Sequence, residues 1–182
     1  LKSKPKISVL PYSRLLKLVE ENQDSFLLTI LFPNPQMPSS VIQVAPIVEF
    51  ENAIISLKQE PLTLKNLKDS NVATIRGTEF SFGEIYAAMV TKKEFNVVPV
   101  NRANQGIKML MKGRVDGYFG PIKLQQYWVS KAGYNWQKDI ADPIMFKNTT
   151  GHLMIAVGKS ISKEASEEFL AKLENAVNLI RD

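Results

Sequence analysis

Two hydrophobic periods alternate between residues 62 and 131, and this alternation restricts the possible folds more than any other feature of the chain. Apolar runs of strand length occupy residues 72–75, 95–100 and 114–119. Apolar residues at helical spacing follow in residues 82–92, in residues 103–112 with Asn101 as the expected cap, and from Pro121 onward. Connections of about 2 to 6 residues between alternating strands and helices are typical of βαβ units. We therefore expect an α/β fold with a mostly parallel sheet in this region.

The two ends of the chain add strands and helices of their own. Before residue 62, the sequence predicts a strand at 7–10, a helix opened by Pro11-Tyr12-Ser13 that runs to about Asn22, a strand at 26–32 and extended chain over 41–57 with a break near Pro46. Three prolines in residues 33–38 require a loop. Toward the end, we expect a strand at 151–157 and an amphipathic helix from Ser162, with Phe169, Leu173, Val177 and Ile180 on one face.

The composition excludes several classes of protein. The chain of 182 residues is 45% hydrophobic and 23% charged, which is ordinary for a globular protein, and no apolar run approaches the roughly 20 residues of a membrane span. Cysteine is absent, so disulfides, thiolate metal sites and a cysteine nucleophile are excluded. The net charge of +5 is scattered and forms no basic stripe interleaved with aromatic residues, so we expect no nucleic acid partner. The chain starts at Leu1 without an initiator Met or a signal peptide, as a mature exported chain or a trimmed chain would.

The loop Arg76-Gly77-Thr78-Glu79 follows the predicted strand at 72–75 and leads into the next helix, for which Ser81 is well placed as the cap. One interpretation is a plain strand-to-helix turn. The other is a cradle for an anionic group, because free backbone N–H groups and the helix dipole both favour negative charge there. A single strand–glycine–helix connection does not decide between a plain turn and an anion-binding site.

Catalytic signals are sparse. The single histidine, His152, lies in or beside a predicted strand and has no partner motif in the sequence. Motifs typical of metalloproteases, serine hydrolases, nucleotide-binding loops or dinucleotide-binding folds are missing. Paired acids such as Glu167-Glu168 lie among lysines on predicted helices, which is typical of solvated faces. We therefore expect no enzyme activity, no metal and no cofactor.

The segment MLMKGRVDGYFGP at residues 109–121 predicts a helix end, a left-handed cap at Gly113 and a strand. Asp116 is the unusual residue, because a charge inside a buried strand needs a partner. We expect backbone amides or a nearby cation to satisfy its carboxylate, and we predict a structural role for it rather than contact with a ligand.

Several stretches together resemble the extracellular solute-binding proteins of family 3, which are type II periplasmic receptors that commonly serve amino-acid importers. The resemblance rests on LPYSRLLKLVEENQDSFLLTILF, LKNLKDSNVATIRGTEFSF, VVPVNRANQGIKMLMKGRVDGYFGP and HLMIAVGKS with the closing helix. It covers nearly the whole chain, and Tyr12 and Arg14 match the family's Pro-Trp-x-Arg helix. The resemblance implies that the loop containing Gly77 and Thr78 faces a cleft between two lobes and contacts the ligand.

Three departures from the family pattern concern the ligand. Nothing precedes Ile7 to supply the usual opening strand and helix. The segment FPNPQMPSSVIQ has no arginine where the family usually has one that holds a ligand carboxylate, and Pro121 stands where amino-acid binders usually have an acidic residue. Losing both groups removes the charge-assisted bonds that hold a zwitterion. A standard amino-acid specificity is therefore not expected.

The resemblance implies an α/β fold of the type II periplasmic-binding-protein kind. It has two lobes, each with a central mostly parallel sheet flanked by helices, and the first lobe is shortened. The expected lobes are residues 1–61 with 150–182, and residues 62–149. The residues expected to contact a ligand are Tyr12, Arg14, Arg76, Gly77, Thr78, Phe119 and Gly120. The implied function is a periplasmic receptor that captures a small polar or anionic solute between its lobes, in partnership with the membrane component of an ABC transporter.

Two other classes stay open at the level of sequence: a degenerate receptor that acts as a sensor or docking module without a transport ligand, and an enzyme on the same fold. An incomplete first lobe would also expose a strand edge, which favours pairing with another chain. A homodimer is therefore a further expectation.

Overall fold

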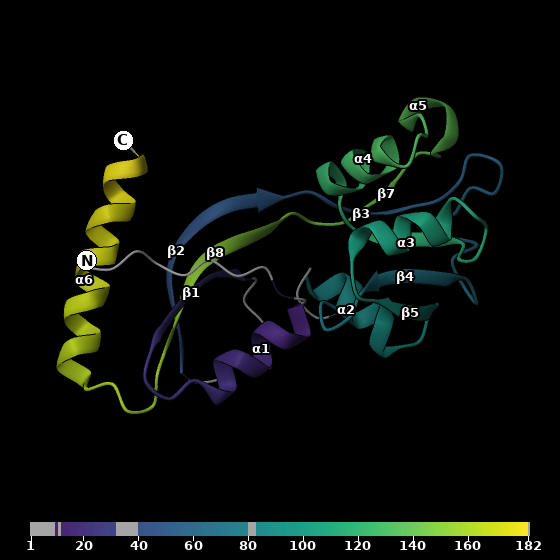
Figure 1. The fold of residues 1–182 in the computed structure, drawn as a ribbon. Helices are drawn as coiled ribbons and strands as arrows, with labels where there is room; N and C mark the ends of the chain where they lie inside the picture. Colours follow the sequence, from purple (N-terminus) through teal and green to yellow (C-terminus); the bar gives the residue numbers. More distant parts are fainter. Residues whose placement is uncertain (1–9, 11, 32–39, 80–82, 182) are drawn as a thin grey trace.

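The apolar runs pair into two separate sheets in a computed structural model, which describes residue 10 and residues 12–31, 40–79 and 83–181 (Figure 1). The smaller sheet has the strand order β1-β8-β2 and the larger sheet the order β5-β4-β6-β3-β7. Strands β1 (Phe26–Leu31), β2 (Val41–Phe50) and β8 (Thr149–Val157) form the smaller sheet. The larger sheet contains β3 (Asn52–Ile55), β4 (Asn71–Ile75), β5 (Asn96–Val100), β6 (Gly117–Pro121) and β7 (Ile144–Met145).

The larger sheet has helices on both faces, which explains why its strands are apolar at successive positions. Strand β4 pairs in parallel with both β5 and β6, as the alternation of strands and helices predicts. One face, which includes Ala73 and Tyr118, packs against α3 (Ala103–Leu110) and α4 (Ile122–Lys131). The opposite face, which includes Val72 and Phe119, packs against α2 (Glu84–Thr91). Adjacent residues of one strand therefore belong to different cores.

The smaller sheet is antiparallel, although the sequence predicts a mostly parallel sheet in each lobe. Strand β2 leads out to the larger sheet and β8 returns from it, so these neighbours run in opposite directions. The sheet lies near the two ends of the described chain. Helix α6 (Lys163–Arg181) packs on it through Phe169, whose ring stacks on Phe26 with 4.2 Å between the ring centroids. Asn22 follows α1 (Tyr12–Glu21) and donates a hydrogen bond to Ala156 O of β8. Strands β1 and β2 are the edges of this sheet. The homodimer expected from an exposed edge stays a prediction.

Two connections join the sheets, and they lie side by side. The first leads from β2 to β3 and the second from β7 to β8. Phe50 pairs with Thr149 on the smaller-sheet side, and the Phe146 N–H donates to Asn52 O at 2.9 Å on the other side. All strands of the larger sheet therefore come from one continuous segment, residues 52–145.

Strand β3 belongs to the larger sheet, although the division expected from the sequence places residues 52–61 with the first lobe. It pairs with β6 on one side and β7 on the other, and all four of its residues are buried. A strand of that kind needs cover on both faces, which only the larger sheet provides. The division into two lobes remains a prediction, with this strand on the side of the second lobe.

Several predicted helix and strand positions are confirmed within one or two residues, and three details differ. Helix α3 has Arg102 at its N-cap rather than Asn101, whose N–H donates instead to Gln105 Oε1. Ser81 lies outside the described residues, and Gly83 is the N-cap of α2. Strand β6 starts at Gly117, three residues later than predicted.

Asp116 lies directly before β6 rather than inside a strand, and it has protein partners in the structural role that the sequence predicts. Its Oδ2 accepts hydrogen bonds from the Asn71 backbone N–H at 2.6 Å and from Asn71 Nδ2 at 3.3 Å. Its own N–H donates to Asn71 O at 2.9 Å. The carboxylate therefore ties the beginnings of β4 and β6 together before the strands pair.

Within the described residues, the helices include none that is long and apolar enough to cross a membrane. The predicted left-handed cap after α3 is present, because Gly113 has φ +62°.

We predict that Gly106→Ala destabilises the fold even though alanine is the better helix former. A Cβ at this position of α3 would lie 2.4 Å from the ring of Tyr118, whose side chain is fully buried. Overpacking of this kind costs about 1–3 kcal/mol of unfolding free energy. Urea unfolding measures the loss, and Lys108→Ala on the exposed side of the same helix should leave stability near that of the wild type.

Candidate functional site

The predicted ligand loop lies where two parallel strands end. Ala73 of β4 pairs with Tyr118 of β6, so both strands finish at the same edge of the larger sheet. Pro121, at the end of β6, pairs with Asn52, the first residue after the connection from β2. The edge therefore faces the connections to the smaller sheet. Open α/β sheets bind ligands beyond the carboxyl ends of their strands.

The residues after β4 form a tight turn that uses most of its own donors. The Thr78 N–H donates to Ile75 O at 3.1 Å, and Gly77 takes φ +85°, which glycine adopts without strain. The Thr78 hydroxyl donates to the same carbonyl at 2.7 Å. The Arg76 N–H donates to Val100 O at 2.8 Å and ties the turn to the end of β5.

This geometry changes what the loop offers a ligand. The sequence predicts free amides and a free hydroxyl at Thr78, but its N–H and hydroxyl are both occupied, and the residue is only 4% exposed. Among the described residues, nothing accepts a hydrogen bond from the Gly77 N–H. The Arg76 side chain is exposed and has no ion pair in the described part of the chain. The remaining donors are therefore the Gly77 amide and the Arg76 guanidinium.

The start of α2 also lies near the connections between the sheets. Gly83 is the N-cap with φ +99°, and no side chain of the described part of the chain caps the helix there. Glu84 supplies a carboxylate in the first turn, where the helix dipole favours negative charge. This carboxylate reduces the attraction of the helix start for an anionic ligand.

A small group of hydroxyls lies beneath the turn, and the sequence did not point to its central member, Tyr86. Thr74 Oγ1 and Thr78 Oγ1 are 3.5 Å apart in the buried interior. The Tyr86 hydroxyl approaches Thr74 without reaching hydrogen-bond geometry, and no other described group bonds to it. Burial raises the pKa of Tyr86 far above its usual value. A tyrosine on an apolar helix face is typical of a core residue, so the sequence held no signal for this hydroxyl.

The other predicted ligand residues divide between strand β6 of the larger sheet and helix α1. Phe119 is 1% exposed and stacks on Tyr86 with 3.5 Å between the ring centroids, so it faces the core of the larger sheet. Gly120 is buried, and its carbonyl accepts a hydrogen bond from Gln125 Nε2 at 3.0 Å. Arg14 is exposed on α1. Tyr12 begins α1, and its side chain lies outside the described part of the structure.

Two cavities flank the connections between the sheets. One of about 450 Å³ lies beside the start of α4, and its lining includes Glu49, Glu51, Pro121 and Lys123. The other, of about 430 Å³, lies beside the start of α2 and is lined by Gly83–Tyr86 and Phe146–Asn148. Asn148 contributes to both. Their volumes lie in the lower part of the range for small-molecule sites.

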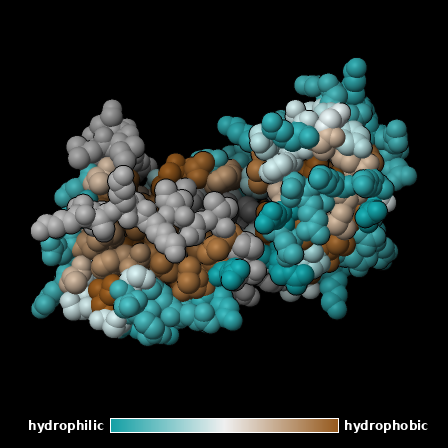
Figure 2. Space-filling model, in the orientation of Figure 1, coloured by the Kyte–Doolittle hydropathy of each residue, from teal (hydrophilic) through white to brown (hydrophobic). Residues whose placement is uncertain are grey.

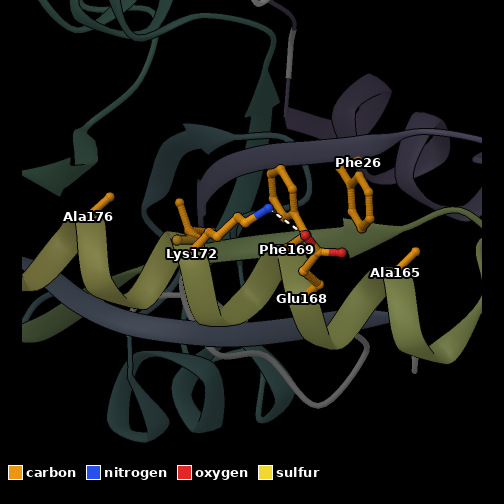
Figure 3. Close-up of a pocket in the computed structure, with 7 residues that line it drawn as sticks. Phe26, Ala165, Glu168, Phe169, Lys172 and Ala176 are labelled. Carbon is orange, nitrogen blue, oxygen red and sulfur yellow. Dashed lines mark hydrogen bonds and ion pairs between the residues drawn. The ribbon is translucent and has the colours of Figure 1, made fainter. Parts of the chain in front are cut away.

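A larger groove of about 490 Å³ lies elsewhere, between α6 and the edge strand β1 (Figure 3). Its lining is mostly apolar, with Phe26, Phe169 and Leu173 beside the ion pair of Glu168 and Lys172. The hydrogen bond from Lys172 lowers the pKa of the Glu168 carboxyl. Because none of the predicted ligand residues lines it, size alone does not identify the candidate site.

His152 lies on β8, and its Nδ1 is buried with no hydrogen-bond partner among the described residues. Within the same residues, no group of three or more His, Asp or Glu side chains could hold a metal ion.

Comparison with solved structures identifies the fold. ArgBP from T. maritima in its holo form matches with a TM-score of 0.68 and 15% identity, over 100% of this chain and 75% of that one. A Salmonella typhimurium periplasmic binding protein with high arginine specificity matches with a TM-score of 0.68 and 17% identity, over 95% and 73% of the two chains. The periplasmic VFT2 domain of Bordetella pertussis BvgS matches with a TM-score of 0.60 and 14% identity, over 91% and 66%.

The chain has the fold of the periplasmic binding proteins. This confirms the predicted fold class, an α/β architecture of the type II periplasmic-binding-protein kind. No family model matches the sequence, and no curated protein matches it. The structures named above are binding proteins or a periplasmic domain. At such low sequence identities, the structural likeness establishes only the fold of this chain.

We predict that Tyr86→Phe leaves stability at neutral pH unchanged or raises it by up to about 1 kcal/mol, because a buried hydroxyl without a partner contributes no bond in the folded state. The wild type should lose stability above pH about 10, where the phenol ionises in the unfolded chain but not in the folded one. Urea unfolding from pH 8 to 11 should show a smaller loss for Tyr86→Phe than for the wild type.

The exposed Tyr127 provides the control, since Tyr127→Phe should follow the wild-type curve. A clear loss of stability in Tyr86→Phe at neutral pH would mean that the hydroxyl does have a bonding partner.

Proposed function

We propose that this chain is a periplasmic solute-binding receptor that captures a small polar or anionic solute between its two lobes. The proposal is supported first by the fold. The chain shares this fold with a periplasmic binding protein of high arginine specificity from Salmonella typhimurium and with a solute receptor for L-cysteine of Neisseria gonorrhoeae. Delivery of the solute to the membrane component of an ABC transporter is part of the proposal.

The observation that carries the proposal is the turn at residues 75–78 at the edge facing the connections. Its backbone is fixed by three hydrogen bonds, to Ile75 O twice and to Val100 O once. The Gly77 N–H has no partner within the described residues, and Arg76 adds an exposed cation beside it. A rigid amide next to a guanidinium fits a carboxylate or another acceptor group of a solute.

Specificity should differ from that of a receptor for a simple amino acid. Pro121 ends β6 without a side-chain carboxylate, so it supplies no negative charge for a ligand ammonium group. Segment 32–42 contains no arginine to hold a ligand carboxylate from the other lobe. We therefore propose a solute that presents an anionic or neutral acceptor group and does not depend on a charged amine.

Closure of the lobes is the proposed mechanism. A solute that contacts both lobes in the closed arrangement, and one lobe in the open arrangement, shifts the population toward the closed form by its differential affinity. The proposed lobes are those of the two sheets, joined at the side-by-side connections. We propose no catalytic step.

One observation favours a second candidate, a receptor-like docking module without a transport ligand. The Thr78 donors are used inside the turn and Glu84 occupies the start of α2, so the loop has fewer groups for a ligand than the sequence predicts. The two candidates differ in whether any solute binds the purified protein.

We predict that a thermal-shift screen of small carboxylates, phosphorylated metabolites and amino acids finds a stabilising solute, and that Arg76→Ala weakens it. Loss of a charged hydrogen bond of about 1.5–3 kcal/mol corresponds to a rise in Kd of roughly 10-fold or more. Isothermal calorimetry with the solute from the screen measures it.

Lys112→Ala provides the control, because Lys112 is an exposed cation just after α3, at the opposite edge of the sheet. Equal affinities of Arg76→Ala and the wild type would remove this turn from the binding site. A screen without any stabilising solute would favour the docking module.

A further inference from the structure

Asn52 lies at the point where the two connections pass each other. It is the first residue of β3, directly after the connection from the smaller sheet, and its side chain is fully buried. Asn52 Nδ2 donates to Phe50 O at 3.2 Å on the first connection. The same nitrogen donates to Thr149 Oγ1 at 2.8 Å, where the second connection enters β8. One amide therefore joins both segments that link the sheets.

The oxygen of the same amide is unused. Asn52 Oδ1 is buried and accepts no hydrogen bond within the described part of the chain. A buried acceptor without a partner is costly, so an arrangement that supplies a donor is favoured by that amount. A small movement of the connections that brings a donor to this oxygen would therefore lower the free energy of that arrangement.

Thr149 extends this contact to the start of α2. A Cβ at Gly83 would lie 3.7 Å from Thr149 Cγ2, so the N-cap of α2 lies against the methyl group of Thr149. Helix α2 follows the turn at residues 75–78 in the chain, and within the described residues no side chain caps its first amides. Thr149 therefore contacts both the Asn52 amide and the N-cap of α2, the helix that follows the proposed ligand turn.

Gln125 provides a comparison inside one sheet. It is also a fully buried amide with an unpartnered oxygen, Oε1. Its Nε2 donates to Ala53 O, Tyr118 O and Gly120 O, which all belong to the larger sheet. The two amides have similar burial, but only Asn52 makes a side-chain bond to the other sheet.

We propose that Asn52 and Thr149 are positioning residues that set the angle between the two lobes. This inference rests on the two-lobe division of the proposed function, but it does not require any particular solute. The Asn52–Thr149 bond holds the connections in the arrangement described here. Rotation of the lobes about the connections breaks or remakes this bond and changes what the orphan oxygen can accept, so the pair biases the balance between arrangements.

The test measures the distance between the lobes with spin labels on the whole protein, without added solute. The chain has no cysteine, so Ser130→Cys on α4 and Ala171→Cys on α6 give two unique and exposed attachment sites. Pulsed electron resonance then reports the distance distribution in the wild-type background and in each variant. Asn52→Ala and Thr149→Val remove the bond from either side, and the second variant conserves side-chain shape.

We expect Asn52→Ala and Thr149→Val to shift or broaden the distribution by more than its wild-type width, and the double variant to add nothing to either. Thr149→Ser, which keeps the hydroxyl, should restore the wild-type distribution. Gln125→Ala should lower stability without moving the distance. If Asn52→Ala does not fold, Thr149→Val against Thr149→Ser gives the same test.

Superimposed distributions for the wild type and Thr149→Val would overturn the proposal, as would an equal shift in Gln125→Ala. The result is independent of the solute screen. If the variants shift the distance but the screen finds no solute, the positioning role stands and the receptor function fails. If a solute binds but the variants leave the distance unchanged, the receptor function stands and the positioning role fails.

Discussion

The parallel pairing of β4 with β5 and β6 is the constraint on which the rest of this structure depends. It brings the ends of three strands to one edge, and it requires helices on both faces because β4 and β6 are buried on both. Strands β3 and β7 extend this sheet by antiparallel pairing next to β6, and their connections to the smaller sheet lie beside that edge. The position of the candidate site follows from sheet topology before any side chain is considered. Figure 2 shows the result as two bodies of the molecule, with hydrophilic residues over much of the body that contains the larger sheet.

Hydrogen bonding within the turn then decides which groups face outward. The Thr78 hydroxyl turns back to Ile75 O, and the Arg76 amide is bonded to Val100 O. Fixing the backbone in this way lowers the entropy cost of binding, since the turn is ordered before a solute arrives. The same bonds occupy donors that a solute could otherwise use, so the turn gains rigidity and loses hydrogen-bonding groups. The surviving donors, the Gly77 amide and the Arg76 side chain, favour an acceptor group on the solute.

The sequence predicts the fold well where hydrophobic period and turn chemistry agree. Gly113 ends α3 as expected, and Asp116 has a backbone partner as expected, because both follow from local rules. The geometry of the candidate site is harder to predict from the sequence. The burial of Phe119 against Tyr86 depends on which face of β6 meets α2, and the bond of Thr78 to Ile75 depends on the shape of the turn. Asn52 gave no signal, because a polar residue at a strand start is ordinary until the second connection is placed beside it.

The proposed binding of a solute at the turn following β4, between the two sheets, is tested most directly by amide chemical shifts of the labelled protein. We expect titration with a stabilising small anion to move the Gly77 resonance most, with smaller changes at Asn148 and Glu84 in the adjoining cavity. Resonances of the opposite edge, at Glu94 and Gly113, should stay in place. Shifts confined to the groove between α6 and β1, or no shift at Gly77 with any solute that stabilises the protein, would contradict binding at this turn.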